Sequence, residues 1–162
     1  MKQPKLTIPK TRFESVLDAI GITIFIMTLG YLFFHFGSLP DQVPGHFNAV
    51  GEVNRWGSKM ELIILPVIGG SMWLLFTVLE KYPHTFNYVN LRANNLEAQY
   101  KNGRLMLNVL KNETVLLFSL LTYLTIQIAL GEAEGLGPWF LPLFMGVIMG
   151  SLLVFVVRML RM

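Results

Sequence analysis

Four long apolar stretches constrain the fold of this 162-residue chain more than any other feature of its sequence. They cover residues 17–36, 61–79, 114–130 and 139–157, and each contains 17 to 20 residues. A helix of 20 residues, rising about 1.5 Å per residue, crosses a hydrocarbon core about 30 Å thick. Few amphipathic segments remain to cover four such helices in a soluble domain. The sequence therefore predicts an all-α integral membrane protein, with four transmembrane helices in a single domain over residues 1–162.

The composition supports a membrane protein and excludes several kinds of chemistry. Charged residues make up 14% of the chain, whereas soluble domains contain roughly 25%. The chain has no cysteine, so disulfides, thiolate nucleophiles and cysteine zinc sites are excluded. It has no glycine-rich phosphate loop, and its basic residues are spread over three segments. We therefore expect the lipid bilayer as a partner and no nucleic acid.

The basic residues predict the orientation, because cytoplasmic segments are enriched in lysine and arginine. Connection 37–60 contains Arg55 and Lys59, and connection 131–138 contains two glutamates and no basic residue. The other 11 of the 13 basic residues lie on the opposite side of the predicted helices: Lys2, Lys5, Lys10, Arg12, Lys81, Arg92, Lys101, Arg104, Lys111, Arg158 and Arg161. We therefore expect a multi-pass protein of the plasma membrane with both termini in the cytoplasm and residues 37–60 outside.

Connection 80–113 has the pattern of an amphipathic helix. Leucines and Tyr100 recur at roughly helical spacing between charged residues from Asn90 to Lys111. We expect a cytoplasmic helix that is broken near Asn102–Gly103 and leads into the third spanning helix. Arg92, Lys101 and Arg104 are candidates for contact with anionic lipid headgroups or with a cytoplasmic protein partner.

Small residues form two candidate packing faces within the spans. They are Gly69, Gly70 and Ser71 in the second stretch, and Gly146, Gly150 and Ser151 in the fourth. Helices in lipid associate where small residues let their backbones approach closely. These faces predict either packing within one chain or a homodimer.

The connection 37–60 has the composition of an ordered lid, with the turn-forming residues Pro40, Pro44, Gly45, Gly51 and Gly57. Prolines lower the entropy cost of ordering, and glycines permit a positive φ. Seven of its side chains are candidates for ligand binding: His46, Asn48, Gly51, Asn54, Arg55, Trp56 and Lys59.

Metal and hydrolytic chemistry are the alternatives for this connection. His46 and Glu52 are candidate ligands of a divalent cation, and no other cofactor is expected. Ser38, Asp41 and His46 have the residue types of a hydrolase, but their spacing matches no known catalytic arrangement. A His-Glu-x-x-His motif is absent. We therefore expect that the protein is not an enzyme.

Residues 40–59 contain the pattern Pro-x-x-Val-Pro-x-His-Phe-Asn-x-x-Gly-x-x-Asn-Arg-Trp-Gly-Ser-Lys, which follows the first predicted helix. This pattern resembles the signature of a bacterial membrane domain of unknown function. That domain forms the N-terminal half of SdpI-type immunity proteins, which protect a cell from a secreted peptide toxin. The resemblance covers residues 17–130, and SdpI-type proteins continue into a second membrane half for which this chain has no room.

The resemblance implies a binding or protective role, of the toxin-immunity or envelope-stress type, through the connection 37–60. The expected ligand is a peptide toxin or a lipid-derived molecule. A second hypothesis is a cation-binding membrane protein or transporter subunit that uses His46 and Glu52. A third is a signalling subunit that recruits a cytoplasmic partner through Arg92, Lys101 and Arg104.

Overall fold

The computed structural model describes residues 3–162, so Lys2, one of the basic residues counted for the orientation, lies outside the described residues. The chain is mostly helical, and four of its helical segments are long and apolar enough to cross a membrane. In chain order the elements are α1 (Arg12–His35), β1 (Gln42–Phe47), β2 (Val53–Ser58), η1 (Lys59–Ile63), α2 (Ile64–Leu79), η2 (Pro83–Thr85), α3 (Leu96–Ala129) and α4 (Phe140–Arg161). The prediction of four spanning helices agrees with these elements.

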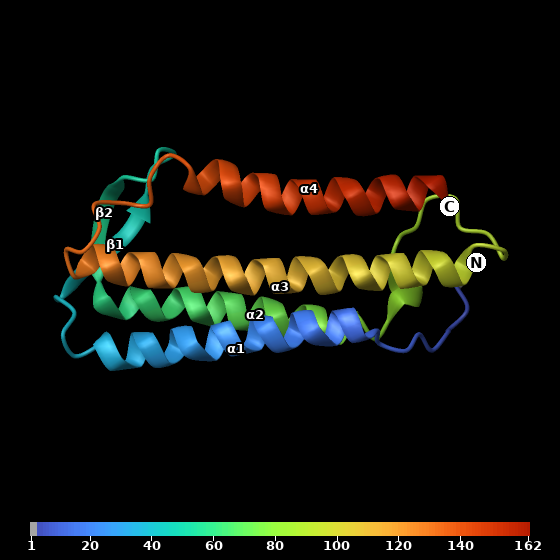
Figure 1. Ribbon diagram of the computed structural model, residues 1–162, viewed down its shortest axis with the longest axis horizontal. Coiled ribbons are helices and arrows are strands. Elements are labelled where there is room, and N and C mark those ends of the chain that lie inside the picture. Colours follow the sequence, from blue (N-terminus) through green and yellow to red (C-terminus); the bar gives the residue numbers. More distant parts are fainter. Residues whose placement is uncertain (1–2) are drawn as a thin grey trace.

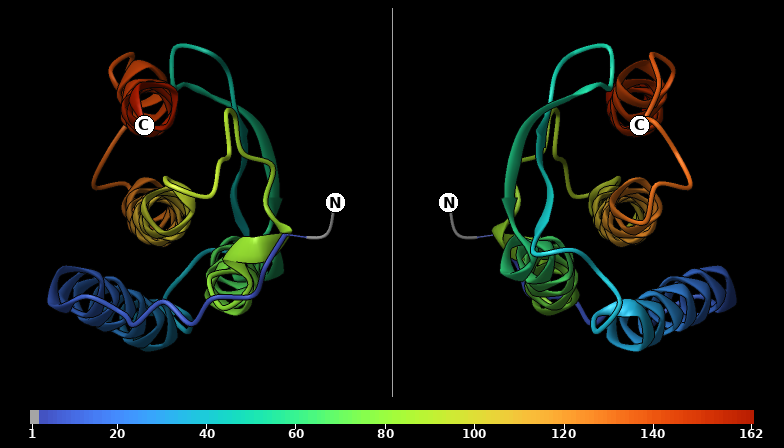
Figure 2. Two further views of the ribbon diagram at one scale, coloured as in Figure 1. Left: turned by 90° about the vertical axis from the view of Figure 1, so that its right-hand side faces the viewer. Right: turned by 90° about the vertical axis from the view of Figure 1, so that its left-hand side faces the viewer.

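Helix α3 is the centre of the bundle, and α1, α2 and α4 each pack against it (Figure 1). Viewed along the bundle, α1 and α2 lie on one side of α3 and α4 lies on another (Figure 2). The strands and the α3–α4 connection occupy one end, which we call the hairpin end. Both ends of the described chain lie at the opposite end (Figure 1).

Helix α3 corrects the prediction of a break near Asn102–Gly103, because its 34 residues form one uninterrupted helix. The two residues that suggested a break instead make packing contacts. The Asn102 side-chain amide donates to the Phe155 carbonyl of α4 at 3.1 Å. A Cβ atom at position 103 would lie 2.9 Å from the Tyr88 ring, so glycine lets the 86–95 segment approach the helix closely. At Asn102 and Gly103, residue types that are typical of a helix break instead let neighbouring segments pack closely against α3.

The connection between α1 and α2 folds into an antiparallel β-hairpin, which the all-α prediction did not include. Val43 pairs with Gly57 and Pro44 with Trp56, and the register shifts on either side of His46. In the turn, the Asn48 side-chain oxygen accepts hydrogen bonds from the backbone N–H groups of Val50 and Glu52, at 3.1 and 2.9 Å. The connection thus forms a two-stranded antiparallel sheet.

An apolar cluster fixes the base of the hairpin on the helices. Val43 of β1 is fully buried and packs with Leu39, Leu62, Leu32 of α1 and Ile126 of α3. The hairpin therefore shares its core with the ends of three helices. A scaffold of this kind can hold side chains of the hairpin in fixed positions.

The two small-residue faces differ in the structure. A Cβ at Gly69 would lie 2.8 Å from Phe118 Cβ, and one at Gly70 would lie 3.0 Å from the Phe25 ring, so this face packs within the chain. A Cβ at Gly146 or Gly150 would meet nothing within 4 Å in residues 3–162. The face of α4 with these two glycines is therefore open in the described chain.

Candidate functional site

The hairpin tip contacts the connection between α3 and α4. The Leu136 N–H donates to the Gly51 carbonyl at 2.8 Å. Gly51 has φ +80°, and a Cβ there would lie 2.5 Å from the Gly137 carbonyl oxygen. Both the backbone conformation and the close approach therefore require glycine. The hairpin thus extends from α2 to the start of α4 (Figure 2).

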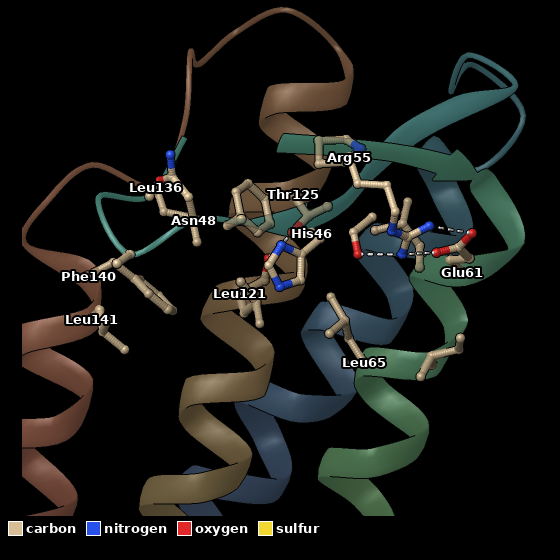
Figure 3. Close-up of a pocket in the computed structure, with 17 residues that line it drawn as sticks. His46, Asn48, Arg55, Glu61, Leu65, Leu121, Thr125, Leu136, Phe140 and Leu141 are labelled. Atoms are coloured by element: carbon tan, nitrogen blue, oxygen red, sulfur yellow. Dashed lines mark hydrogen bonds and ion pairs between the residues drawn. The ribbon is translucent and has the colours of Figure 1, made fainter. Parts of the chain in front are cut away.

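A cavity of about 610 Å³ lies beneath this hairpin. Its lining has a polar part on the hairpin side and an apolar part on the helices (Figure 3). The polar side chains are His46, Asn48, Arg55, Glu61 and Thr125, and the largest apolar ones are Phe47, Leu62, Ile64, Leu65, Leu121, Leu136, Phe140 and Leu141. A few polar groups over a mostly apolar wall are typical of a pocket for a small ligand.

The two ring nitrogens of His46 differ in their hydrogen bonding. Its Nδ1 atom lies 2.6 Å from the Asn54 Oδ1 atom. Because an amide oxygen only accepts, Nδ1 carries the proton and donates it to this oxygen. In residues 3–162, the Nε2 atom forms no hydrogen bond with the protein. The ring lies over the helix ends near Leu121 and Thr125 (Figure 3), so a neutral His46 presents an acceptor to the cavity.

Arg55 is held in place by two partners. Its Nη2 donates to the Gly45 carbonyl and to Glu61 Oε2, each at 2.7 Å, and its Nη1 donates to Glu61 Oε1 at 3.3 Å (Figure 3). The hydrogen bonds to Glu61 and the negative charge of Glu61 raise the pKa of Arg55 above its usual value. A Cβ at Gly45 would lie 2.7 Å from Nη2, so glycine makes room for the guanidinium. The Arg55 charge is therefore already paired within the chain.

The seven candidate ligand-binding residues divide into three groups. His46, Asn48, Gly51 and Arg55 line the cavity. Asn54 orients the His46 ring through a hydrogen bond but is not part of the cavity lining. Trp56 is 49% exposed, and Lys59 pairs with Asp41 at 3.6 Å, so these two lie outside the lining. Sequence reasoning missed the apolar wall, because its leucines resemble every other leucine of the spans.

The two candidate metal ligands lie on opposite sides of the hairpin turn. Glu52 accepts a hydrogen bond from the Asn48 side-chain amide at 2.8 Å, whereas His46 bonds to Asn54. In residues 3–162, no group of three or more His, Asp or Glu side chains is placed to hold a metal ion.

The three basic residues assigned to a cytoplasmic partner also separate. Arg92 is exposed, and Lys101 forms an exposed ion pair with Glu97 at 2.6 Å. Arg104 is only 5% exposed, and it donates to both oxygens of Glu14 of α1, at 3.0 and 2.7 Å. The structure therefore does not place Arg104 on the same surface as Arg92 and Lys101.

A second buried ionic cluster, centred on Lys111, joins three helices at the end opposite the hairpin. The Lys111 side chain is fully buried, with Nζ at 2.9 Å from Asp18 of α1 and 2.7 Å from Glu80, which follows α2. The amides of Asn108 and Asn112 donate to Asp18 at 2.9 and 2.8 Å. Ionisable residues in membrane helices usually face the bundle interior and pair in this way. Sequence reasoning treated Lys111 as a cytoplasmic surface charge and missed this cluster.

Comparisons with known proteins gave a family match and a distant relative. Residues 23–70 match the model of a family described as a domain of unknown function, DUF1648. An uncharacterized protein of Archaeoglobus fulgidus is 32% identical over 93 residues, which cover 52% of this chain and 49% of that protein. The chain thus spans about half the length of that relative. No solved structure matches.

The four candidate spans define a multi-pass membrane protein. The segment similar to DUF1648, residues 23–70, includes the second half of α1, the whole hairpin and the first part of α2. Four of the five polar side chains in the cavity lining, all except Thr125, therefore lie within the matched residues.

Proposed function

We propose that this protein binds an extracytoplasmic ligand in the cavity beneath the hairpin and protects the membrane by doing so, as SdpI-type immunity proteins protect a cell from a peptide toxin. One observation carries the proposal. The residues of the 40–59 pattern form the roof of a cavity of about 610 Å³, and four of the seven candidate binding residues line it. Ligand pockets in proteins commonly measure about 300–1,000 Å³.

The fixed positions of the polar groups support binding as the role of this site. Asn54 holds His46, and Gly45 and Glu61 hold Arg55, so neither side chain has to be ordered when a ligand arrives. Preorganised groups avoid the entropy cost of ordering side chains in the complex. A hairpin that had only to connect two helices would not need these contacts.

The distribution of charge supports an orientation with the hairpin outside the cell. At the hairpin end the basic residues are Arg55 and Lys59, whereas the other described lysines and arginines belong to the opposite half of the bundle or its connections. Positive charge near the ends of spanning helices marks the cytoplasmic side. A ligand of the cavity would then approach from outside or from the outer leaflet.

A protection assay with matched variants tests the proposal. Cells sensitive to the peptide toxin of an SdpI-type system would produce the wild-type chain, the His46→Ala variant or the Lys101→Ala variant, in equal amounts in the membrane. We expect the wild type and Lys101→Ala to raise survival, and His46→Ala to lose most of that protection, because it removes the free ring nitrogen from the cavity. A folded wild-type chain that gives no protection, or a His46→Ala variant that protects fully, would contradict the proposal.

A further inference from the structure

We propose that the ligand of this cavity is a single-chain amphiphile, with an uncharged or cationic head that donates a hydrogen bond to His46 and an apolar chain that lies between α3 and α4. The inference rests on the binding site proposed above and specifies the chemical class of its ligand. Three features support it: the apolar space between α3 and α4, the charges at the hairpin end, and the free nitrogen of His46.

The apolar space continues beyond the main cavity. A smaller cavity of about 190 Å³ lies between the hairpin-end halves of α3 and α4, and it is lined by Leu117, Phe118, Leu121, Phe140, Leu141 and Phe144. Leu121, Phe140 and Leu141 line both cavities, so the two adjoin at the first turn of α4. The smaller cavity has no polar side chain in its lining. We call it the tail seat, because its walls suit a hydrocarbon chain and offer nothing to a polar group.

The tail seat lies within segments that can cross a membrane. Its residues belong to α3 and α4, whose apolar windows are among the four candidate spans. Leu141 is exposed on the outside of the described chain, so the seat lies near the lipid-facing surface of the helices. A hydrocarbon chain that moves from the bilayer into the tail seat leaves one apolar environment for another. The chain therefore contributes little to the binding affinity by itself. Selection among amphiphiles must therefore come from the head.

The charges at the hairpin end disfavour an anionic head. Arg55 is paired with Glu61, and Lys59 with Asp41, so both basic residues of this end are already neutralised. In residues 3–162 no basic side chain pairs with the three remaining acids of this end, Glu52, Glu132 and Glu134. An excess of negative charge attracts cations and repels anions.

The free nitrogen of His46 defines the hydrogen bond that the head must make. With Nδ1 donating to Asn54, the Nε2 atom of a neutral ring is an acceptor above the apolar wall. A hydroxyl, an amide N–H or an ammonium group can donate to it. Two sources share this chemistry: a free lipid with an amine or hydroxyl head, and the acylated end of a lipopeptide.

Photo-crosslinking with chain-matched probes tests the class of ligand. The protein, in phosphatidylcholine nanodiscs, would be exposed to three probes with the same diazirine-bearing hexadecyl chain and an amine, a hydroxyl or a phosphate head. Crosslinks would be mapped by mass spectrometry. We expect the amine and hydroxyl probes to label the tail seat, at about tenfold lower concentration than the phosphate probe. Equal labelling by the phosphate probe would overturn the assignment of the head.

Two pairs of variants test the two halves of the site. Leu121→Trp fills the junction of the two cavities and should abolish labelling of the tail seat, whereas Leu120→Trp places the same bulk on the α1-facing side of α3 and should not. His46→Phe removes the acceptor while keeping a ring, and should raise the required amine-probe concentration about tenfold; Trp56→Phe, outside the cavity lining, should leave it unchanged. Labelling that is spread over the lipid-facing surface and is unaffected by Leu121→Trp would contradict binding of the chain in the tail seat.

Competition distinguishes the sources and separates this inference from the protective role. If unlabelled hexadecylamine displaces the amine probe and a palmitoylated peptide does not, the ligand is a free lipid. If the palmitoylated peptide displaces the probe as well, the ligand is the acylated end of a lipopeptide. A protein that shows head-selective labelling of the tail seat but gives no protection in cells retains this inference and loses the proposed function. A protein that protects cells without such labelling retains the function and loses the inference.

Discussion

Lys111 is a single residue on which the packing of three helices depends. Its ammonium group lies between the carboxylates of Asp18 and Glu80 and 4.9 Å from the centre of the Trp73 ring. Breaking a buried ionic cluster costs about 3–5 kcal/mol. Without Lys111, the remaining basic partner of Asp18 and Glu80 in residues 3–162 is Lys10, whose side chain is partly exposed. We therefore expect Lys111→Met to lower the free energy of unfolding by about that amount, as measured by denaturant titration in detergent micelles.

Lys101 provides the matched control for this prediction. It lies on the same helix and forms an ion pair with Glu97, but both side chains are exposed. Exposed pairs contribute about 0–1 kcal/mol, so Lys101→Met should change the stability little. Equal effects of the two substitutions would show that the buried cluster does not hold the helices together.

Gly51 determines whether the hairpin tip can contact the α3–α4 connection. Alanine there would have to adopt φ +80° and would bring its Cβ to 2.5 Å from the Gly137 carbonyl oxygen. The left-handed conformation alone costs about 1–2 kcal/mol for a residue with a Cβ. We expect Gly51→Ala to lower the unfolding free energy by at least about 1 kcal/mol in the same titration. Gly30→Ala is the control, because a Cβ there meets nothing within 4 Å, and a loss as large as that of Gly51→Ala would argue against the contact.

Single residues also show where sequence reasoning fails. Gly51 was predictable as a turn residue with a role, because glycine in a proline-rich connection suggests a positive φ. The partners of Lys111 and Arg104 were not, because Asp18 and Glu14 lie about 90 residues earlier in the chain. A charge at the edge of a span looks the same in the sequence whether it faces water or another helix.

At the scale of elements, α3 differs most from its prediction. An uninterrupted helix of 34 residues keeps its backbone hydrogen bonds through Asn102 and Gly103. Its first half is also buried in places, at Tyr100, Asn102, Arg104 and Asn108. We therefore expect the amide hydrogens of residues 100–112 to exchange as slowly as those of residues 113–125 in hydrogen-exchange mass spectrometry. Fast exchange confined to residues 101–105 would restore the predicted break.

The hairpin is the element that the sequence concealed. β1 has the sequence Gln-Val-Pro-Gly-His-Phe, in which a proline and a glycine both argue against a strand. A two-stranded sheet has only edge strands, and the register shifts beside His46 accommodate the irregular segment. The prolines and aromatic residues of the connection suggested that it would be ordered, but they did not suggest that two of its segments would pair as β-strands.

The whole molecule allows a direct test of orientation, because the chain has no cysteine. Single cysteines introduced at Glu134, in the α3–α4 connection, and at Glu97, near the start of α3, would report on the two ends of the bundle. With the hairpin end outside, a membrane-impermeant maleimide should label Glu134→Cys in intact cells and label Glu97→Cys only after lysis. The reverse pattern would invert the orientation and place the cavity at the cytoplasmic side.

The arrangement of the helices shows a limit of prediction for the whole molecule. Their number and the approximate ends of α1, α2 and α4 followed from length and hydropathy. Their order around α3 did not follow, because side chains that face lipid are as apolar as those that face a neighbouring helix. The cavity was hidden for the same reason, since the apolar helical part of its wall consists of leucines, Ile64 and Phe140 from three separate spans.

The position of the tail seat between α3 and α4 also determines how occupancy would depend on the amounts of ligand and lipid. An amphiphile that reaches this seat first dissolves in the bilayer, where other lipids dilute it. Its mole fraction in the membrane, and not its concentration in water, then sets the fraction of protein that is occupied. Adding empty vesicles at a constant total amount of ligand would therefore empty the site, although the volume of the sample had hardly changed.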